Sequence, residues 1–176
     1  MIPDPLHPSL VHFPIVLAVL LPMAVLVAWF AIRKGSNARA TWSIVVVLSL
    51  VLFASAFVTS RSGEAQEDTV EKVLASEVPL HSHEEAAERF IVIVALTFGL
   101  STIGLLGGRV GRVGRVAMIA GSLATAASVY PVGRSGGELV YDHGAAAAYS
   151  GTTQSRQAGV APGAANARSE GQAAHD

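Results

Sequence analysis

Four long runs of this 176-residue chain contain no Asp, Glu, Lys or Arg, and they constrain the fold more than any other feature of the sequence. The runs cover residues 11–32, 40–60, 90–108 and 116–133. Each is 18 to 22 residues long, and a helix needs about 20 apolar residues to cross a bilayer. Buried helices of soluble domains are usually shorter and keep a polar face. The sequence therefore predicts an all-α, four-helix transmembrane bundle.

The composition agrees with a membrane location and excludes several kinds of site. Charged residues make up only 14% of the chain, against roughly 25% in soluble domains. The chain has no cysteine. Disulfides, thiolate metal sites, iron–sulfur clusters and covalently attached c-type haem are therefore excluded.

The charges flanking the four runs predict the orientation in the membrane. Two short connections, residues 33–39 and 109–115, each carry three basic residues and no acidic one. The opposite side receives all 13 acidic residues and the other six basic ones. Because basic residues are retained on the cytoplasmic side, we expect both termini to lie outside the cytoplasm, which for a bacterial chain in the cytoplasmic membrane means the periplasm or the cell exterior. The arginines of 109–115 are interpreted as a topology anchor, and no nucleic-acid partner is expected.

Two segments outside the runs have distinct patterns. Between residues 64 and 78, Val70, Val73, Leu74 and Val78 share one helical face, which predicts an amphipathic loop helix at the extracytoplasmic surface. Beyond about residue 150 the chain is rich in Gly, Ala, Ser and Gln without periodicity, which is typical of disorder. We therefore expect a membrane domain over 1–149 and a disordered extracytoplasmic tail over 150–176.

Histidines are the most informative polar residues of the chain. Of the six, His7, His12, His83 and His143 lie near ends of the predicted helices on the extracytoplasmic side, as does His81, while His175 lies in the tail. Glu64 and Glu138 flank the same ends. In an up-and-down bundle these ends meet at one rim. The pattern predicts a cluster of His7, His12, His83 and His143, with Glu138 and Glu64 as nearby carboxylates.

Imidazoles are ligands for haem iron and for divalent metals, and carboxylates can complete or orient such a site. The prediction is a b-type haem held by histidines or, alternatively, a divalent metal that also uses Glu138 and Glu64. A simpler interpretation is that His and acidic residues merely enrich the wet headgroup zone.

Three segments resemble a known bacterial family. They are Leu-His-Pro-Ser-Leu-Val-His-Phe-Pro at 6–14, His83-Glu84, and Gly-Gly-Glu-Leu-Val-Tyr-Asp-His-Gly at 136–144. Together they resemble the membrane family catalogued as domain of unknown function 2231, over about residues 1–149. The resemblance implies four transmembrane helices, no established activity and an association with redox modules. It carries over His7, His12, His83, Glu138 and His143.

The sequence is compatible with three classes of function. The first is a haem- or metal-binding, redox-associated membrane module with a redox or membrane-protein partner. The second is a scaffold or assembly subunit that binds a partner protein without catalysis. The third, a transporter or proton channel, is disfavoured because ionisable residues are nearly absent from the four runs. No motif of a conventional hydrolase or nucleotide-dependent enzyme is present.

Overall fold

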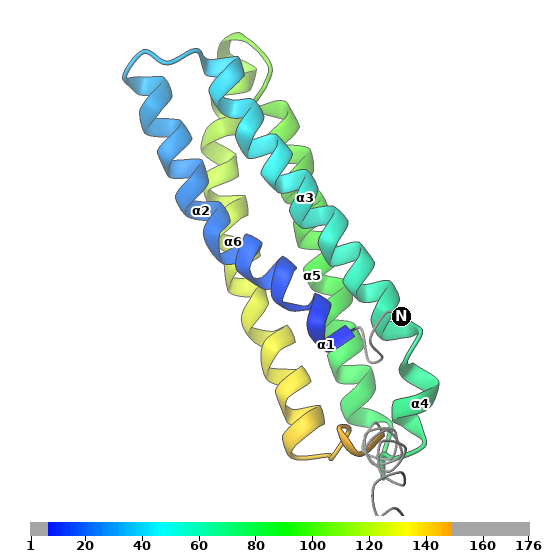
Figure 1. Cartoon of the computed structure of the whole chain (residues 1–176). Coiled ribbons are helices and arrows are strands. Elements are labelled where there is room, and N and C mark those ends of the chain that lie inside the picture. Colours follow the sequence, from blue (N-terminus) through cyan, green and yellow to red (C-terminus); the bar gives the residue numbers. More distant parts are fainter. Residues whose placement is uncertain (1–6, 149–176) are drawn as a thin grey trace, which may run out of the picture.

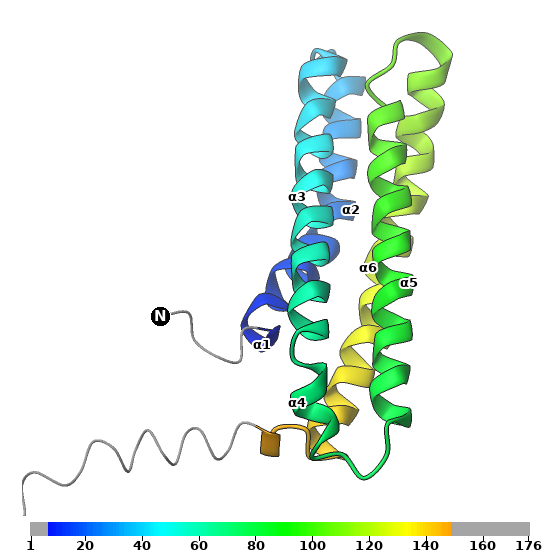
Figure 2. The same ribbon diagram turned by 90° about the vertical axis from the view of Figure 1, so that its right-hand side faces the viewer.

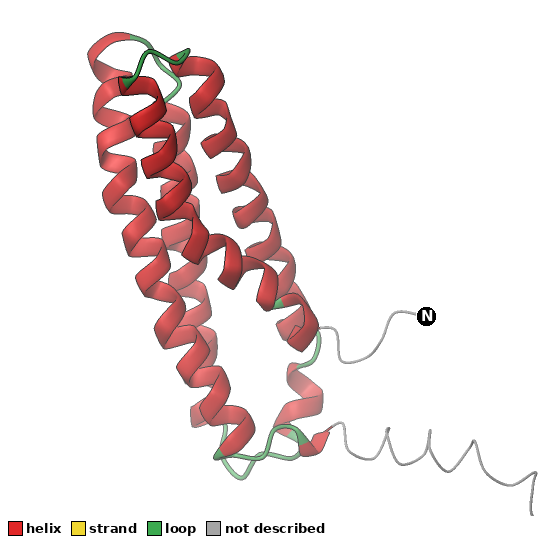
Figure 3. Cartoon of the chain, turned by 60° about the vertical axis from the view of Figure 1, so that its left-hand side comes forward, coloured by secondary structure: helices red, strands yellow, loops and turns green. Residues whose placement is uncertain are grey.

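The computed structural model describes residues 7–148, and this part of the chain is built from helices and loops, without strands (Figures 1 and 3). The predicted tail, 150–176, lies outside the described residues. The elements are α1 (His7–Leu10), α2 (His12–Arg33), α3 (Ala38–Glu64), α4 (Glu67–Glu71), α5 (Val78–Ile103) and α6 (Gly108–Tyr141). Within residues 7–148, four helical segments are long and apolar enough to cross a membrane. The prediction of an all-α, four-helix membrane bundle is confirmed.

The long helices form two hairpins that pack side by side (Figure 2). The first consists of α2 and α3, preceded by the short α1, and the second consists of α5 and α6. Between the hairpins, α2 packs on α6 and α3 packs on α5. The loops after α2 and α5 lie at one end of the bundle, and α1, α4 and the end of α6 lie at the other (Figure 1). Successive long helices thus run in opposite directions, as expected for four consecutive membrane-spanning runs.

The bundle buries apolar side chains along its axis and exposes further apolar ones around its circumference. The main core consists of Ala18, Leu21, Val25, Ala28, Trp42, Val45, Leu52, Ala56, Phe90, Val94 and Met118. Outward-facing Val27, Ile44 and Leu96 are each more than 60% exposed. Such a surface would be costly in water and suits contact with lipid. The chain is thus a multi-pass membrane protein.

Within the described residues, every buried side-chain nitrogen or oxygen atom has a hydrogen-bond partner. The Thr97 and Thr125 hydroxyls lie 2.9 Å apart, across α5 and α6. The Trp42 indole Nε1 donates to the Ser101 carbonyl oxygen at 2.9 Å, linking α3 to α5. Hydrogen bonds of this kind hold helices together in lipid, where the hydrophobic effect contributes little to their association.

The connection between α5 and α6 is shorter than the sequence predicted. We expected a loop over 109–115, but α6 begins at Gly108, so these residues form its first turns. Gly108 has φ +65°, a conformation that favours glycine at the sharp entry to the helix. The Arg115 guanidinium turns back and donates to the Gly104 carbonyl oxygen at 2.7 Å. The basic residues nevertheless stay at the end of the bundle that holds the two short loops (Figure 1).

The predicted amphipathic helix over 64–78 is only partly formed. The helix α4 covers Glu67–Glu71 alone, and turns follow it. Val70 and Leu74 pack against a second small core of Leu80, Leu139 and Ala145. Val73 and Val78 are 41% and 72% exposed. Half of the apolar face therefore docks on the ends of α5 and α6, and the other half does not.

Candidate functional site

The first candidate residue, His7, lies at the start of the first hairpin. The ribbon bends within α2, and α1 lies across the end of α3 (Figure 1). Pro14 has no N–H with which to bond the Leu10 carbonyl, and the Thr59 hydroxyl donates to that carbonyl instead, at 3.4 Å. The His7 Nδ1 lies 3.0 Å from the Thr59 carbonyl oxygen and 3.2 Å from the Ser62 hydroxyl. A carbonyl only accepts, so Nδ1 carries the hydrogen and Nε2 holds the lone pair of the neutral ring.

The second candidate residue, His83, lies in the second turn of α5 and packs on α6. Its Nδ1 lies 3.0 Å from the Ser135 hydroxyl. That hydroxyl donates its own hydrogen to the Val132 carbonyl oxygen at 3.2 Å, so the oxygen accepts from Nδ1–H. Nε2 of the neutral ring is again the atom with a free lone pair.

Glycines make room for both rings. A Cβ atom at Gly63 would lie 3.1 Å from Cε1 of His7, and one at Gly136 would lie 3.1 Å from Cε1 of His83. Both distances are tighter than ordinary van der Waals contact. Each imidazole therefore rests directly on the backbone of the neighbouring helix.

The two imidazoles meet between the hairpins. Their ring centroids lie 6.4 Å apart with an interplanar angle of 83°, and both side chains are half-buried. They border a small pocket of about 60 Å³. Apart from the two histidines and the hydroxyl residues Thr59 and Ser60, its lining is apolar: Val11, Pro14, Ile15, Ala56, Ala87, Phe90, Ile91, Val129 and Val132.

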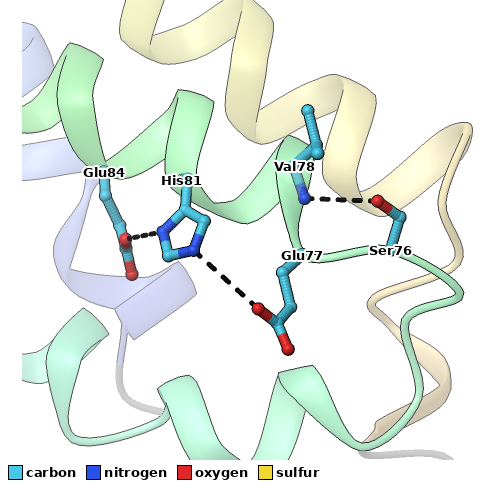
Figure 4. A network of polar contacts seen from close by, with 5 residues as sticks. All are labelled: Ser76, Glu77, Val78, His81 and Glu84. Carbon is cyan, nitrogen blue, oxygen red and sulfur yellow. Dashed lines mark hydrogen bonds and ion pairs between the residues drawn. The ribbon is translucent and has the colours of Figure 1, made fainter.

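The other histidines of the predicted cluster have different surroundings. His12 opens α2 and is exposed, and His143 follows α6 and is also exposed. His81 lies on the outer surface of α5, where its Nδ1 is 3.1 Å from a Glu84 carboxylate oxygen and its Nε2 is 4.0 Å from Glu77 (Figure 4). The structure thus brings His7 and His83 together and leaves His12 and His143 at the surface.

The predicted carboxylates are engaged with arginines on their own helices. Glu64 accepts from Arg61 at 2.7 Å, and Glu138 accepts from Arg134 at 2.7 Å. Within residues 7–148, no group of three or more His, Asp or Glu side chains is arranged to hold a metal ion. A site formed by all four histidines with Glu64 and Glu138 therefore stays a prediction. Of these six residues, His7 and His83 are the two whose rings lie next to each other.

Acidic residues cluster on the loop side of the same bundle end. Repulsion from the Glu84 carboxylate is the main cause that raises the pKa of Glu67, and Glu71 adds to it. Glu67 is partly exposed and lies in α4, so this charge repulsion acts on the segment between α3 and α5.

The groups that hold the imidazoles were not among the residues predicted from the sequence. These are the Ser62 and Ser135 hydroxyls and the Thr59 carbonyl. A signal was present: the triplet Arg-Ser-Gly occurs at 61–63 and again at 134–136.

Comparison with known proteins identifies the family and nothing more specific. Neither curated proteins nor solved structures gave a significant match to the chain. The family described as predicted membrane protein (DUF2231) matches residues 3–148. This match includes both hairpins and all the described residues that contact the histidine pair, and the chain therefore belongs to the DUF2231 family of predicted membrane proteins.

Proposed function

We propose that the chain is a redox-associated membrane module that binds one transition-metal ion between its hairpins, with His7 and His83 as ligands. The observation that carries this proposal is the 6.4 Å separation of two nearly perpendicular imidazoles. A metal–nitrogen bond is about 2 Å long, and the ring centre lies roughly 1 Å beyond the nitrogen. Two imidazoles that bind one ion from opposite sides therefore stand about 6 Å apart, which is close to the observed separation.

The hydrogen bonds of both rings support a ligand role. Each Nδ1–H is engaged, by the Thr59 carbonyl in one case and the Ser135 hydroxyl in the other. Metal-binding histidines usually donate their second ring N–H to such a group, which fixes the tautomer and the ring orientation. Nε2 is then the ligand atom on both sides.

The number of ligands and the size of the pocket favour copper in its monovalent state. Zinc sites in proteins use three or four protein ligands, whereas Cu(I) is stable with two imidazole nitrogens, and imidazole is a good ligand for copper. A b-type haem also needs only two histidines, but pockets for organic ligands usually exceed about 300 Å³. The pocket beside His7 and His83 holds about 60 Å³. Haem would therefore require the two hairpins to move apart.

We also propose the location and orientation of the site. The two short loops and the basic residues near them would face the cytoplasm of a bacterial cell. Both termini, and with them the His7–His83 pair, would then lie at the extracytoplasmic side of the cytoplasmic membrane. A redox partner would approach from that side, and residues 1–149 would form the membrane domain.

The test uses the full chain, purified in detergent under reducing conditions. We expect one Cu(I) per chain by elemental analysis and by titration against a chromogenic copper chelator. His7→Ala and His83→Ala should each abolish binding, and His81→Ala should not, because that ring is exposed and contacts only acidic side chains. A Soret band that both His7→Ala and His83→Ala remove would identify haem as the occupant instead. A protein with neither metal nor haem would contradict the proposal and favour the scaffold function.

A further inference from the structure

The second helices of the two hairpins share a sequence repeat. Eight residues of α3 recur in α6 at a constant spacing of 73 positions, for example Ser62 and Ser135. The pairs are Arg39 and Arg112, Ser49 and Ser122, Leu50 and Leu123, Ala54 and Ala127, Ser55 and Ser128, Arg61 and Arg134, Ser62 and Ser135, and Gly63 and Gly136. One shared residue type would mean little, but eight at one spacing relate the two helices along their whole length.

The first helices of the hairpins are related through their buried positions. A spacing of 76 positions places His7 on His83. The same spacing pairs the buried residues of α2 with buried positions along α5 and just after it: Ala18 with Val94, Leu21 with Thr97, Val25 with Ser101, and Ala28 with Gly104. The two residues of each pair differ in type, but both are buried, so α2 and α5 turn equivalent faces to the interior of the bundle. The three-residue difference between the two spacings falls in the loops.

The packing of the bundle agrees with this equivalence. Exchanging α2 with α5 and α3 with α6 converts the contact of α2 with α6 into that of α5 with α3, and both contacts are present. Both hairpins start at the same end of the bundle and run in the same direction (Figure 2). The hairpins are therefore related by an approximate twofold axis along the bundle.

The histidines and their partners obey the same relation. The His7 ring contacts Ser62 and Gly63 of α3, and the His83 ring contacts Ser135 and Gly136 of α6. Both serine hydroxyls donate to the carbonyl three residues earlier, of Thr59 and of Val132. Each hairpin thus contributes one complete half: an imidazole, a hydroxyl that contacts its Nδ1, and a glycine beneath the ring.

We infer that the site consists of two equivalent half-sites, and that Ser62 and Ser135 are positioning residues that orient the imidazoles toward a ligand on the twofold axis. Such a ligand presents the same chemistry to both sides, as a single metal ion or the iron at the centre of a planar macrocycle does. A polar organic molecule with two different ends would not fit this symmetry. The ligand class rests on the proposed function, whereas the role of the serines in holding the rings does not.

The first measurement concerns the ligand-free protein, so that it does not depend on metal binding. Nitrogen-15 NMR of labelled imidazoles reports which ring nitrogen carries the hydrogen. We expect the Nδ1–H form for both His7 and His83. Ser62→Ala should shift the Nδ1 signal of His7 and leave that of His83 in place, and Ser135→Ala should do the reverse. Unchanged Nδ1 signals in both variants would overturn the positioning role.

The second measurement is the affinity for Cu(I) of the same full-length variants. Loss of a group that orients a metal-binding histidine typically lowers affinity by about 10- to 100-fold, and both alanine variants should show such a loss. Ser62→Thr and Ser135→Thr keep the hydroxyl and should restore most of the affinity. A loss of affinity in only one of the two alanine variants would contradict the equivalence of the half-sites. Absence of Cu(I) and haem binding in the unsubstituted protein would contradict the proposed function alone, because the NMR result stands without it.

The matched controls come from the same repeat. The Ser55 and Ser128 hydroxyls donate to the Leu52 and Thr125 carbonyls, also three residues earlier. They lie seven residues before Ser62 and Ser135, on the same helices, and contact no histidine. Ser55→Ala and Ser128→Ala should leave both the Nδ1 signals and the affinity unchanged. An equal effect of these controls would mean that any serine of α3 or α6 acts through helix stability, and it would overturn the inference.

Discussion

Replacement of Gly104 by alanine should strongly destabilise the end of the bundle that holds the short loops. Gly104 directly follows α5, and Trp42 of α3 lies against it, fully buried. A Cβ atom at Gly104 would lie 2.6 Å from Cε2 of the Trp42 indole, and closer still to its Nε1. No rotation of a methyl group relieves such an overlap, so the indole must move.

The expected loss in the free energy of unfolding follows from the contacts that the Trp42 indole loses when it moves. Overpacking a close-packed core costs about 1–3 kcal/mol. The Trp42 indole Nε1 also donates to the Ser101 carbonyl oxygen at 2.9 Å, and leaving a buried donor unpaired costs about 1–3 kcal/mol. Gly104→Ala should therefore lower the free energy of unfolding by roughly 2–5 kcal/mol.

The assay is reversible unfolding in mixed micelles, followed by tryptophan fluorescence and by helix content. Gly99→Ala is the matched control, because Gly99 lies five residues earlier, within α5, and a Cβ there meets nothing within 4 Å. We expect the control to retain the stability of the unsubstituted protein. If Gly104→Ala and Gly99→Ala unfold at the same denaturant concentration, the contact between α3 and α5 described above is wrong.

Three further predictions concern the other end of the bundle and the orientation. Gly63→Ala and Gly136→Ala should each displace one imidazole, since a Cβ would lie 3.1 Å from the ring in both cases, and the Nε2 NMR signal of that ring should move. A single cysteine placed at Ser36 should resist a membrane-impermeant thiol reagent added to intact cells, because its loop carries basic residues, which are retained on the cytoplasmic side. Rapid labelling of this cysteine would contradict the proposed orientation. Since the Glu84 carboxylate raises the pKa of Glu67, the ionised form destabilises the folded loop, and stability should increase as the pH falls through that pKa. Hydrogen exchange over 67–74, corrected for intrinsic rates, should show this dependence and lose it in Glu67→Gln.

The sequence alone was sufficient for the four helices and their alternating directions. A bilayer has no water to satisfy an exposed backbone, so each uncharged run of about 20 residues has essentially one solution, a helix. The ion pairs of Glu64 with Arg61 and of Glu138 with Arg134 could also have been read from the sequence. Their spacings of three and four residues place the two side chains on one face of a helix.

The tertiary structure decided which histidines meet. A histidine near a helix end reaches the correct side of the membrane whatever the rotation of its helix, and the sequence therefore could not separate His7 and His83 from His12 and His143. The rotation is set by packing: small residues such as Gly63 and Gly136 allow the imidazoles to lie between the hairpins, and the bend within α2 brings His7 of α1 over α3. His12 then lies on an exposed face. Hydrophobicity determines which segments cross a membrane, but only the fit of side chains between helices determines which faces turn inward.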